Sequence, residues 1–202
     1  MVRNGTRRAR VDRAERREQL LDAAVVVIRR DGPDASMSAI AAEGGVTKPI
    51  LYRHFGDRQG LVRALVDRFT RQLGDELGAA LALDVEPRRA LVAAIDAHVR
   101  VVERDPQLYR FLTRAGTPEE LLEITERIAT DVAVVLGERI RQYGGDSGAA
   151  EPWAHGIVGM VHLAADWWVE RRTMPRARLV EYLASLLWDG MSSVADQEGA
   201  SK

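Results

Sequence analysis

The chain has 202 residues, of which 46% are hydrophobic and 29% charged, enough for a buried core in one domain or two small ones. It contains no cysteine, which excludes a disulfide framework and a thiolate metal site. No apolar run approaches the roughly 20 residues of a membrane-spanning helix, and no apolar segment follows the basic N-terminus as it does in a secretory signal. We therefore expect a cytoplasmic protein without a membrane partner.

The formal net charge of −1 hides an uneven distribution. Residues up to Arg71 carry fifteen Lys and Arg against nine Asp and Glu, a balance of +6, so the remainder carries −7. A basic N-terminal part on an acidic body is typical of a protein that concentrates its attraction for DNA at one end. Residues 1–12 hold four arginines without apolar periodicity. They predict a basic flexible arm that binds phosphates or enters a minor groove. The alternative is a solvated tail without a role.

Apolar residues recur at helical spacing through the rest of the chain and predict an all-α fold of about nine helices. The first helix is expected to end near Asp31, and the eighth to run from about residue 151 to 173. Capping residues and prolines mark the other boundaries: Ser36, Thr47, Asp57, Asp105-Pro106, Thr117-Pro118 and Met174-Pro175. No segment alternates as a strand does, and no internal repeat is evident.

Residues 36–55 carry most of the functional information. They predict a short helix, a turn at Gly44-Gly45 with freedom in φ, and a second helix that starts at Lys48. Four apolar residues have the spacing of a buried seam between the two helices: Ile40, Val46, Leu51 and Phe55. Lys48 is the only lysine before the C-terminal residue. It stands where a major-groove reader places a base-contacting side chain.

The other outward side chains divide into base and backbone contacts. Lys48 can donate to guanine O6 or N7, whereas Pro49 and Ile50 can touch a thymine methyl group. Hydroxyl and basic side chains nearby are the further candidates for DNA contact, chiefly with phosphates: Ser36, Ser38, Thr47, Tyr52, His54 and Arg58. Tyr52 and His54 could equally pack the small domain against its neighbour.

Four short segments, residues 36–41, 45–47, 51–55 and 57–61, together resemble the N-terminal signature of TetR-like transcriptional repressors. The resemblance covers about residues 15–65. It implies a helix-turn-helix DNA-binding domain at 13–58, a ligand-binding and dimerisation domain at 59–202, and a homodimer. It also implies base contacts for Lys48, Pro49 and Ile50. The chain departs from the family where Gly44 replaces the more frequent alanine or leucine and Gly60 a common glutamate.

Two heads one helical turn apart on DNA need a symmetric dimer. All four tryptophans lie on the last two predicted helices. The apolar side chains of these helices predict a four-helix seam between two copies, with a simple core as the alternative: Trp153, Ile157, Met160, Val161, Ala164, Trp167, Trp168, Leu183, Leu187, Trp188 and Met191.

An effector pocket is expected among the fourth to eighth helices if the family architecture holds. Its candidate residues are mostly polar or aromatic: His98, Tyr109, Arg110, Phe111, Arg114, Met160, His162 and Trp168. His98 lies on an apolar stripe and could instead be a core histidine, and Arg110 and Arg114 could pair with a ligand carboxylate or with acidic neighbours. The aliphatic surroundings favour an elongated apolar effector such as a fatty acid or another lipid-like molecule.

The expected function is that of a ligand-responsive repressor that binds a pseudo-palindromic operator as a homodimer and is released by its effector. Neither a glycine-rich phosphate loop nor a serine elbow is present, so no catalytic residue and no cofactor are predicted. Two alternatives stay open. One is a metal-dependent helical enzyme that uses His155, His162 and Asp166, and the other is a helical adaptor whose head no longer binds DNA.

Overall fold

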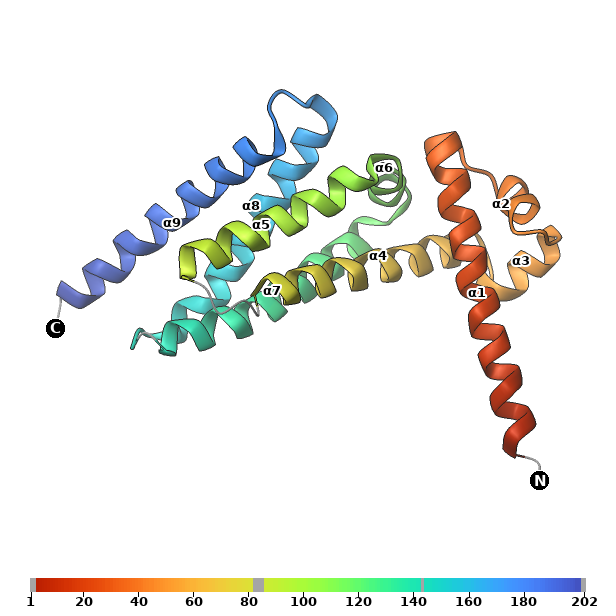
Figure 1. The fold of residues 1–202 in the computed structure, drawn as a ribbon, viewed down its shortest axis with the longest axis horizontal. Coiled ribbons are helices and arrows are strands. Elements are labelled where there is room, and N and C mark those ends of the chain that lie inside the picture. Colours follow the sequence, from red (N-terminus) through yellow and green to blue (C-terminus); the bar gives the residue numbers. More distant parts are fainter. Residues whose placement is uncertain (1–2, 82–85, 143, 201–202) are drawn as a thin grey trace. The chain divides into compact units, whose positions relative to one another are not determined.

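The computed structural model describes residues 3–81, 86–142 and 144–200, and every regular element in these ranges is helical (Figure 1). The predicted all-α fold with about nine helices is confirmed for them. The α-helices are α1 Arg3–Asp31, α2 Met37–Glu43, α3 Lys48–Phe55, α4 Arg58–Leu81, α5 Pro87–Arg104, α6 Pro106–Ala115, α7 Pro118–Gln142, α8 Ala150–Arg171 and α9 Arg176–Ala200. Short 3-10 turns lie at Gly32–Asp34 (η1) and Ser147–Ala149 (η2). Of the described helices, none combines the length and apolarity that crossing a bilayer requires.

Side-chain caps begin three of the helices as the sequence predicts. Ser36, Asp57 and Asp105 each accept a hydrogen bond from the backbone N–H three residues further on, at 3.1, 2.6 and 3.3 Å. Thr47 does occupy the N-cap position of α3, but its side chain makes no capping bond. Its backbone carbonyl accepts the first bonds of that helix instead. The predicted N-cap position of Thr47 is therefore confirmed, although its side chain does not make the bond.

The first helix begins at Arg3, ahead of the predicted start, so residues 3–12 belong to α1. The sequence predicted a flexible arm there because the segment lacks an apolar stripe. An apolar stripe marks a helix face that packs in a core, so its absence from the sequence does not argue against a helix. Arginine and alanine favour the helix, and no proline interrupts α1.

The chain divides into two compact units. The head comprises Met1–Phe69 and Asp105–Thr117, and the body comprises Thr70–Arg104 and Pro118–Lys202. Helix α6 thus belongs to the head, although 35 residues separate it along the chain from the rest of that unit. Helix α4 contributes its first part to the head and its second part to the body. The sequence-based boundary between residues 58 and 59 stays a prediction.

In the head, α2 and α3 lie beside α1, as Figure 1 shows, and α1 also contacts η1 and α6. The core consists of aliphatic and aromatic side chains that are at most 4% exposed: Leu20, Leu21, Val27, Ile28, Ile40, Leu51, Leu61, Leu65, Tyr109, Phe111 and Leu112. Each buried large aliphatic side chain contributes about 1.5–3 kcal/mol. This core holds the small helices α2 and α3 in place.

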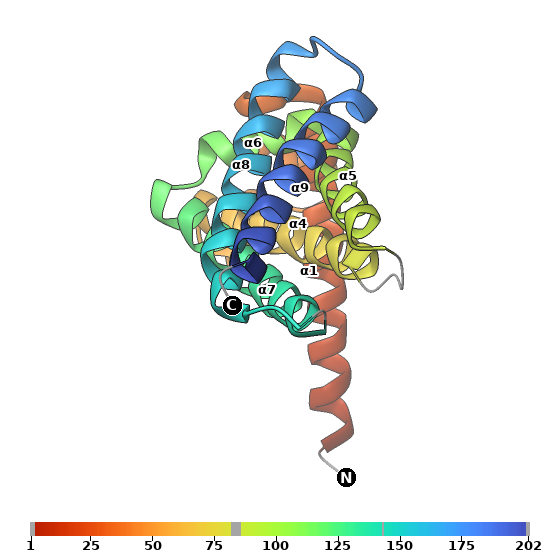
Figure 2. The ribbon, with the colours of Figure 1, turned by 90° about the vertical axis from the view of Figure 1, so that its left-hand side faces the viewer.

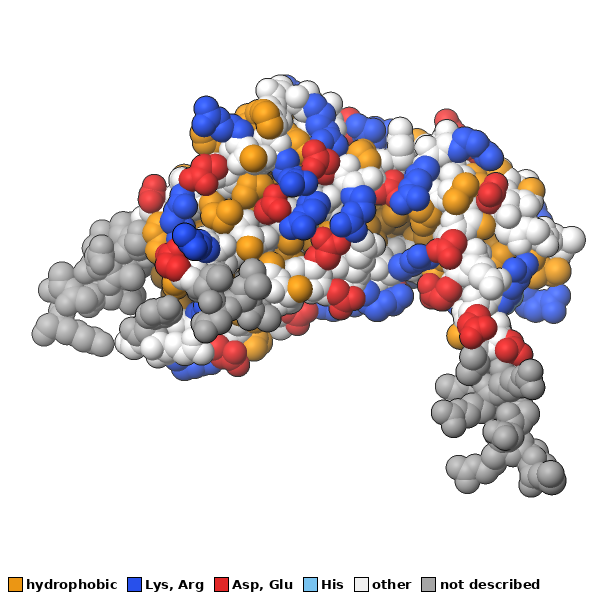
Figure 3. Space-filling model, viewed as in Figure 1, with side chains coloured by type: hydrophobic (Ala, Val, Ile, Leu, Met, Phe, Trp, Pro, Cys, Tyr) orange, Lys and Arg blue, Asp and Glu red, His pale blue; other side chains and the backbone are white. Residues whose placement is uncertain are grey.

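In the body, α7 packs on α8, and α5 contacts both α8 and α9. Ion pairs join α5 to α9: the guanidinium of Arg176 lies 2.9 Å from Asp96 and 2.8 Å from Glu103, and Arg88 lies 2.7 Å from Glu181. Figure 3 shows basic and acidic side chains interspersed over this face. Exposed pairs contribute less than about 1 kcal/mol each, so they align the two helices more than they stabilise them.

Candidate DNA interface and ligand cavity

The inner face of α3 is anchored by apolar side chains. Leu51 and Ile40 are fully buried and Phe55 is 8% exposed, as the sequence predicts. Val46 is only half-buried, which corrects the predicted seam. It lies in the turn before α3 and thus outside the two packed helices. Leu51 and Phe55 of α3, packed with Ile40 of α2, are enough to fix which side of α3 faces outward.

The outward face of α3 begins with its first residues. Lys48, Pro49 and Arg53 are exposed, and Ile50 and Tyr52 are half-buried. Lys48 and Tyr52 are four residues apart, as are Pro49 and Arg53, so the four side chains share one side of the helix. The remaining hydroxyl candidates are also exposed: Ser36, Ser38 and Thr47. The head therefore exposes basic and hydroxyl-bearing side chains on the outer side of α3 and at the start of α2.

The two glycines of the turn serve different purposes. Gly45 has φ +62°, a left-handed conformation that a side chain disfavours. Gly44 has φ −74° and needs no such freedom, but a Cβ there would lie 2.7 Å from Leu20 Cδ2. The sequence-based explanation by freedom in φ thus holds for Gly45 and is wrong for Gly44. The guanidinium of Arg16 donates to the Gly44 carbonyl at 2.9 Å and ties the turn to α1.

His54 is half-buried beside the basic side chains of α1. Its Nδ1 is buried and has no hydrogen-bond partner among the described residues. Burial lowers the pKa of the imidazole, and the positive charges of Arg13, Arg16, Arg53 and Arg17 lower it further. The ring is therefore neutral at pH 7, within a region of positive potential that would attract an anion. Its contact with a phosphate stays a prediction.

Arg58 makes contacts inside the head. Its Nη1 donates to the Ala35 carbonyl at 2.8 Å, and its guanidinium carbon lies 5.5 Å from the centre of the Phe111 ring. The residue thus links the start of α4 to the segment before α2 and to α6. Sequence reasoning assigned Arg58 to phosphate and missed this positioning role, because its partners are 23 residues before it and 53 after it along the chain.

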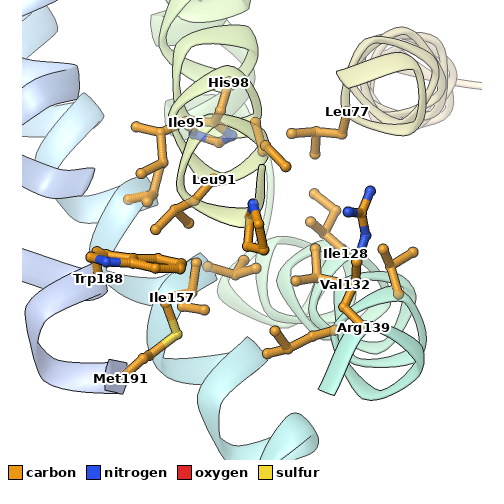
Figure 4. Close-up of a pocket in the computed structure, with 17 residues that line it drawn as sticks. Leu77, Leu91, Ile95, His98, Ile128, Val132, Arg139, Ile157, Trp188 and Met191 are labelled. Carbon is orange, nitrogen blue, oxygen red and sulfur yellow. The ribbon is translucent and has the colours of Figure 1, made fainter. Parts of the chain in front are cut away.

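A cavity of about 150 Å³ lies in the body, between the end of α4 and helices α5, α7, α8 and α9 (Figure 4). Its lining is apolar except for His98 on α5 and Arg139 on α7. The lining residues are Leu77, Pro87, Ala90, Leu91, Ala94, Ile95, His98, Ile128, Val132, Val135, Leu136, Arg139, Ile157, Val158, Val161, Trp188 and Met191. The shape and chemistry suit an apolar ligand.

Only His98 of the eight predicted effector residues lines this cavity. Tyr109, Arg110, Phe111 and Arg114 lie on α6 in the head, where Tyr109 and Phe111 are core residues. The other three lie on α8 without lining the cavity: Met160, His162 and Trp168. Sequence reasoning selected aromatic and polar residues, whereas the lining is mainly aliphatic.

Arg139 was missed as a cavity residue, although the sequence holds a signal for it. Ile128, Val132 and Val135 form an apolar stripe at helical spacing on α7, and Arg139 continues the same stripe. The aliphatic stem of an arginine can pack along an apolar surface while its guanidinium supplies a polar group at the edge of that surface. This pattern could have placed Arg139 beside His98 in the candidate list.

Among the described side chains of the last two helices, four large apolar ones are exposed: Leu163 and Trp167 on α8, and Tyr182 and Leu186 on α9, with exposures of 41–69%. We call them the α8/α9 patch; Figure 2 shows both helices on the side of the body that faces the viewer. Only Trp167 was in the predicted dimer seam. The other predicted members are buried in the core, line the cavity or are half-buried: Trp153, Ile157, Met160, Val161, Ala164, Trp168, Leu183, Leu187, Trp188 and Met191.

The histidines of the alternative metal site have different neighbours. His155 Nε2 lies 3.4 Å from Glu126 of α7, whereas the His162 ring centre is 6.4 Å from that of His98 on α5. In the part of the chain that the structure describes, no three His, Cys, Asp or Glu side chains are grouped as a metal site requires. The arrangement does not support the proposed grouping of His155, His162 and Asp166.

Two family models match the chain. The one described as bacterial regulatory proteins of the tetR family matches residues 20–65, which include α2 and α3. The one described as a tetracyclin repressor-like C-terminal domain matches residues 76–202. Together they cover the helix-turn-helix and most of the body.

Similar proteins span nearly the whole chain. It is 36% identical over 198 residues to the HTH-type transcriptional regulator Rv0472c of Mycobacterium tuberculosis (96% of this chain, 85% of the relative). It is 32% identical over 196 residues to the HTH-type transcriptional activator FasR of Mycolicibacterium smegmatis (94% and 90%). The structure of the regulator FadR from Bacillus subtilis in complex with stearoyl-CoA shares the fold, with a TM-score of 0.66 and 21% identity over 84% of this chain and 96% of FadR. The chain therefore belongs to the TetR family of helix-turn-helix transcriptional regulators.

Proposed function

We propose that the protein is a ligand-responsive repressor that binds a pseudo-palindromic operator as a homodimer and is released by a small apolar effector. The observation that carries the DNA-binding part is the outward face of α3, with Lys48, Pro49 and Arg53 exposed over the buried anchors Leu51 and Phe55. A short helix held in this way can enter a major groove with its first residues against base edges.

Individual roles follow from side-chain chemistry. Lys48 donates to guanine, and Pro49 and Ile50 contact a thymine methyl group. The hydroxyl groups of Tyr52 and Thr47 donate to phosphates and fix the register. Three further residues contact the phosphate backbone of the DNA: Ser36, Ser38 and His54. Ser36 keeps a hydroxyl proton to donate, because its cap uses only the oxygen as an acceptor.

The α8/α9 patch is the proposed dimer interface. Leu163 and Trp167 are four residues apart on α8, and Tyr182 and Leu186 are four apart on α9, so each pair forms a stripe along its helix. Two copies that join these stripes would bury aromatic and aliphatic side chains of the kind that dominate stable interfaces. A symmetric dimer also supplies the two heads that a palindromic site requires.

The cavity of the body is the proposed effector site. Its lining is aliphatic apart from two residues, which suits a fatty-acid-like or other lipid-like molecule. The stearoyl-CoA complex of FadR is a lipid-bound example of this fold. The chain passes from head to body within α4, returns to the head at α6, and enters the body again at α7. A ligand that favours one arrangement of the body can therefore shift the population of dimers that are able to bind DNA.

The proposed activity is regulation of transcription rather than catalysis. The proposed location is the cytoplasm, where the DNA that a bacterial regulator binds is found. Repression is the expected sign of control. FasR is an activator, so the sign needs its own measurement. A reporter gene behind the bound operator tests it: repression predicts higher expression when the protein is deleted, and lower expression would contradict it.

DNA binding is tested by selecting duplexes from a random pool and measuring their affinity by fluorescence anisotropy at rising salt. For a protein that binds DNA, the logarithm of the affinity falls linearly with the logarithm of the salt concentration, because each phosphate contact releases counterions. Such a protein also prefers the selected duplex to a scrambled one by about a thousandfold or more. An affinity independent of salt and sequence would contradict the proposal and favour the adaptor alternative.

A further inference from the structure

His98 is a polar residue in an apolar cavity. It lies on α5, lines the cavity beside Ile95 and Leu91, and is 9% exposed (Figure 4). Its Nε2 is buried without a hydrogen-bond partner among the described residues. An unsatisfied buried nitrogen destabilises the fold, and a leucine at the same place would avoid that cost. The position thus holds an unused hydrogen-bonding group at the wall of a cavity.

We propose that His98 hydrogen-bonds an uncharged oxygen, a carbonyl or hydroxyl, within the apolar body of the effector. This inference rests on the proposed function, because it names the chemistry of the ligand in the same cavity. The effector class becomes an aliphatic or lipid-like molecule with an internal ketone, ester, thioester or alcohol oxygen. A plain hydrocarbon would leave His98 unpaired.

The surroundings of His98 keep its imidazole neutral. Burial lowers its pKa to about 4, with a smaller contribution from His162 of α8, whose ring centre lies 6.4 Å away. In a neutral imidazole, Nε2 either carries the proton and donates to a carbonyl or hydroxyl oxygen, or lacks it and accepts from a hydroxyl group. The neutral ring offers no positive charge to a carboxylate, which would lose its hydration in the cavity without compensation from this residue.

Arg139 supplies the charged element of the same lining. It lies on α7, and Figure 4 shows aliphatic side chains between it and His98. The cavity thus separates a neutral hydrogen-bonding group on α5 from a cationic side chain on α7. The uncharged oxygen of the effector belongs near His98.

The experiment uses three chain-matched probes: 2-octanone with an uncharged carbonyl, octanoate with a carboxylate, and 1-octene with no oxygen. Each displaces the apolar dye N-phenyl-1-naphthylamine from the full-length protein. We compare wild type with His98→Leu, which removes the polar nitrogens, and His98→Gln, which keeps hydrogen-bonding groups. Ile128→Val, at another point of the lining, is the matched control for a change in cavity volume. Thermal unfolding confirms that each variant is folded.

We expect His98→Leu to lower the affinity for 2-octanone by about three- to tenfold relative to the affinity for 1-octene, which is the range of one neutral hydrogen bond. His98→Gln should restore part of this difference, and Ile128→Val should change both probes alike. The ratio of octanoate to 1-octene should stay within about twofold in His98→Leu.

Three results would overturn the inference, and they separate it from the proposed function. If 2-octanone and 1-octene lose equal affinity in both His98 variants, His98 does not recognise an oxygen, although the cavity still binds ligands. If octanoate is the probe that His98→Leu weakens most, the recognised group is charged. If no probe displaces the dye from wild type, the cavity does not take apolar ligands, and the effector part of the proposed function fails as well.

Discussion

Arg29 of α1 and Asp105 at the start of α6 form a paired contact in which both Nε and Nη2 of the arginine lie 2.7 Å from Oδ2 of the carboxylate. The other oxygen, Oδ1, accepts the Leu108 N–H at 3.3 Å and caps α6. One buried carboxylate therefore begins α6 and fastens it to α1. Because α6 is separated in sequence from the rest of the head, this contact is part of what makes it a head helix.

Replacing Asp105 by alanine should lower the free energy of unfolding by about 2 kcal/mol, because both the cap and the charged bond are lost. Asp105→Asn keeps an oxygen that can cap α6 and should cost about half as much. Urea unfolding followed by circular dichroism measures both. Arg30→Ala is the matched control, since Arg30 is exposed and bonds mainly to its neighbour Asp31. An equal loss in Asp105→Ala and Arg30→Ala would contradict the role of Asp105.

At Gly45 an asparagine should be less destabilising than an alanine, whereas at Gly44 it should not be. Gly45→Ala should cost about 1–2 kcal/mol because of its positive φ, and Gly45→Asn less, since asparagine adopts the left-handed conformation more readily. At Gly44 the obstacle is Leu20, so Gly44→Asn should cost at least as much as Gly44→Ala. Unfolding free energies of the four variants test the order. A benefit from asparagine at Gly44 would refute the steric explanation.

Local signals in the sequence were enough to predict where most helices begin. Ser36, Asp57 and Asp105 can bond to an N–H three residues on, which requires no knowledge of the tertiary structure. The outward placement of Lys48 also follows locally, because Leu51 and Phe55 fix the opposite side of a short helix. The family resemblance supplied the arrangement of the whole, which spacing alone does not determine.

The functions of the body's apolar residues could not be predicted in the same way. Helix α8 carries apolar side chains on several sides, so periodicity does not separate core, cavity and exposed patch. The neighbours Trp167 and Trp168 illustrate this: the first is 41% exposed, and the second is 1% exposed with its indole N–H bonded to the Met174 carbonyl at 2.8 Å. Only the positions of the other helices distinguish them.

Lys48→Ala should reduce the preference for the selected operator over a scrambled duplex by about tenfold, the range of one good base contact. Tyr52→Phe should weaken both duplexes alike, since it removes a phosphate donor. Arg53→Ala is a further comparison that should lower the slope of log affinity against log salt by about one. Anisotropy titrations at several salt concentrations measure all three. Equal losses on both duplexes for Lys48→Ala would reject its base contact.

Trp167→Glu should convert the proposed dimer to monomers, because a carboxylate would be buried in the apolar α8/α9 patch. The variant should stay folded, since Trp167 is exposed in a single chain. Sedimentation equilibrium measures the mass in solution. Leu122→Glu is the control: Leu122 is also an exposed apolar residue, at 60%, but it lies on α7 outside the patch. If Trp167→Glu remains dimeric, or Leu122→Glu becomes monomeric, the interface lies elsewhere.

The buried imidazole of His98 should make the protein less stable in acid. Its pKa is about 4 in the folded chain and about 6.5 in an unfolded one, so between these values the unfolded chain binds more protons. The free energy of unfolding should therefore fall as the pH falls from 6.5 to 4, by up to about 3 kcal/mol from this group. His98→Leu should remove this part of the pH dependence, whereas wild type and variant should run parallel above pH 7.

His155→Gln is the control of opposite sign for that titration. Bonds to the Glu151 carbonyl and to Glu126 raise the pKa of His155, so its stabilisation is present in acid and is lost as the pH rises through the folded value. Removing it should make the acid loss steeper, whereas removing His98 makes it shallower. Urea titrations of the three proteins at half-unit steps from pH 4 to 8 compare the slopes. Parallel curves for wild type and His98→Leu would mean that the imidazole gains a proton without cost, and that it is more hydrated than its burial implies.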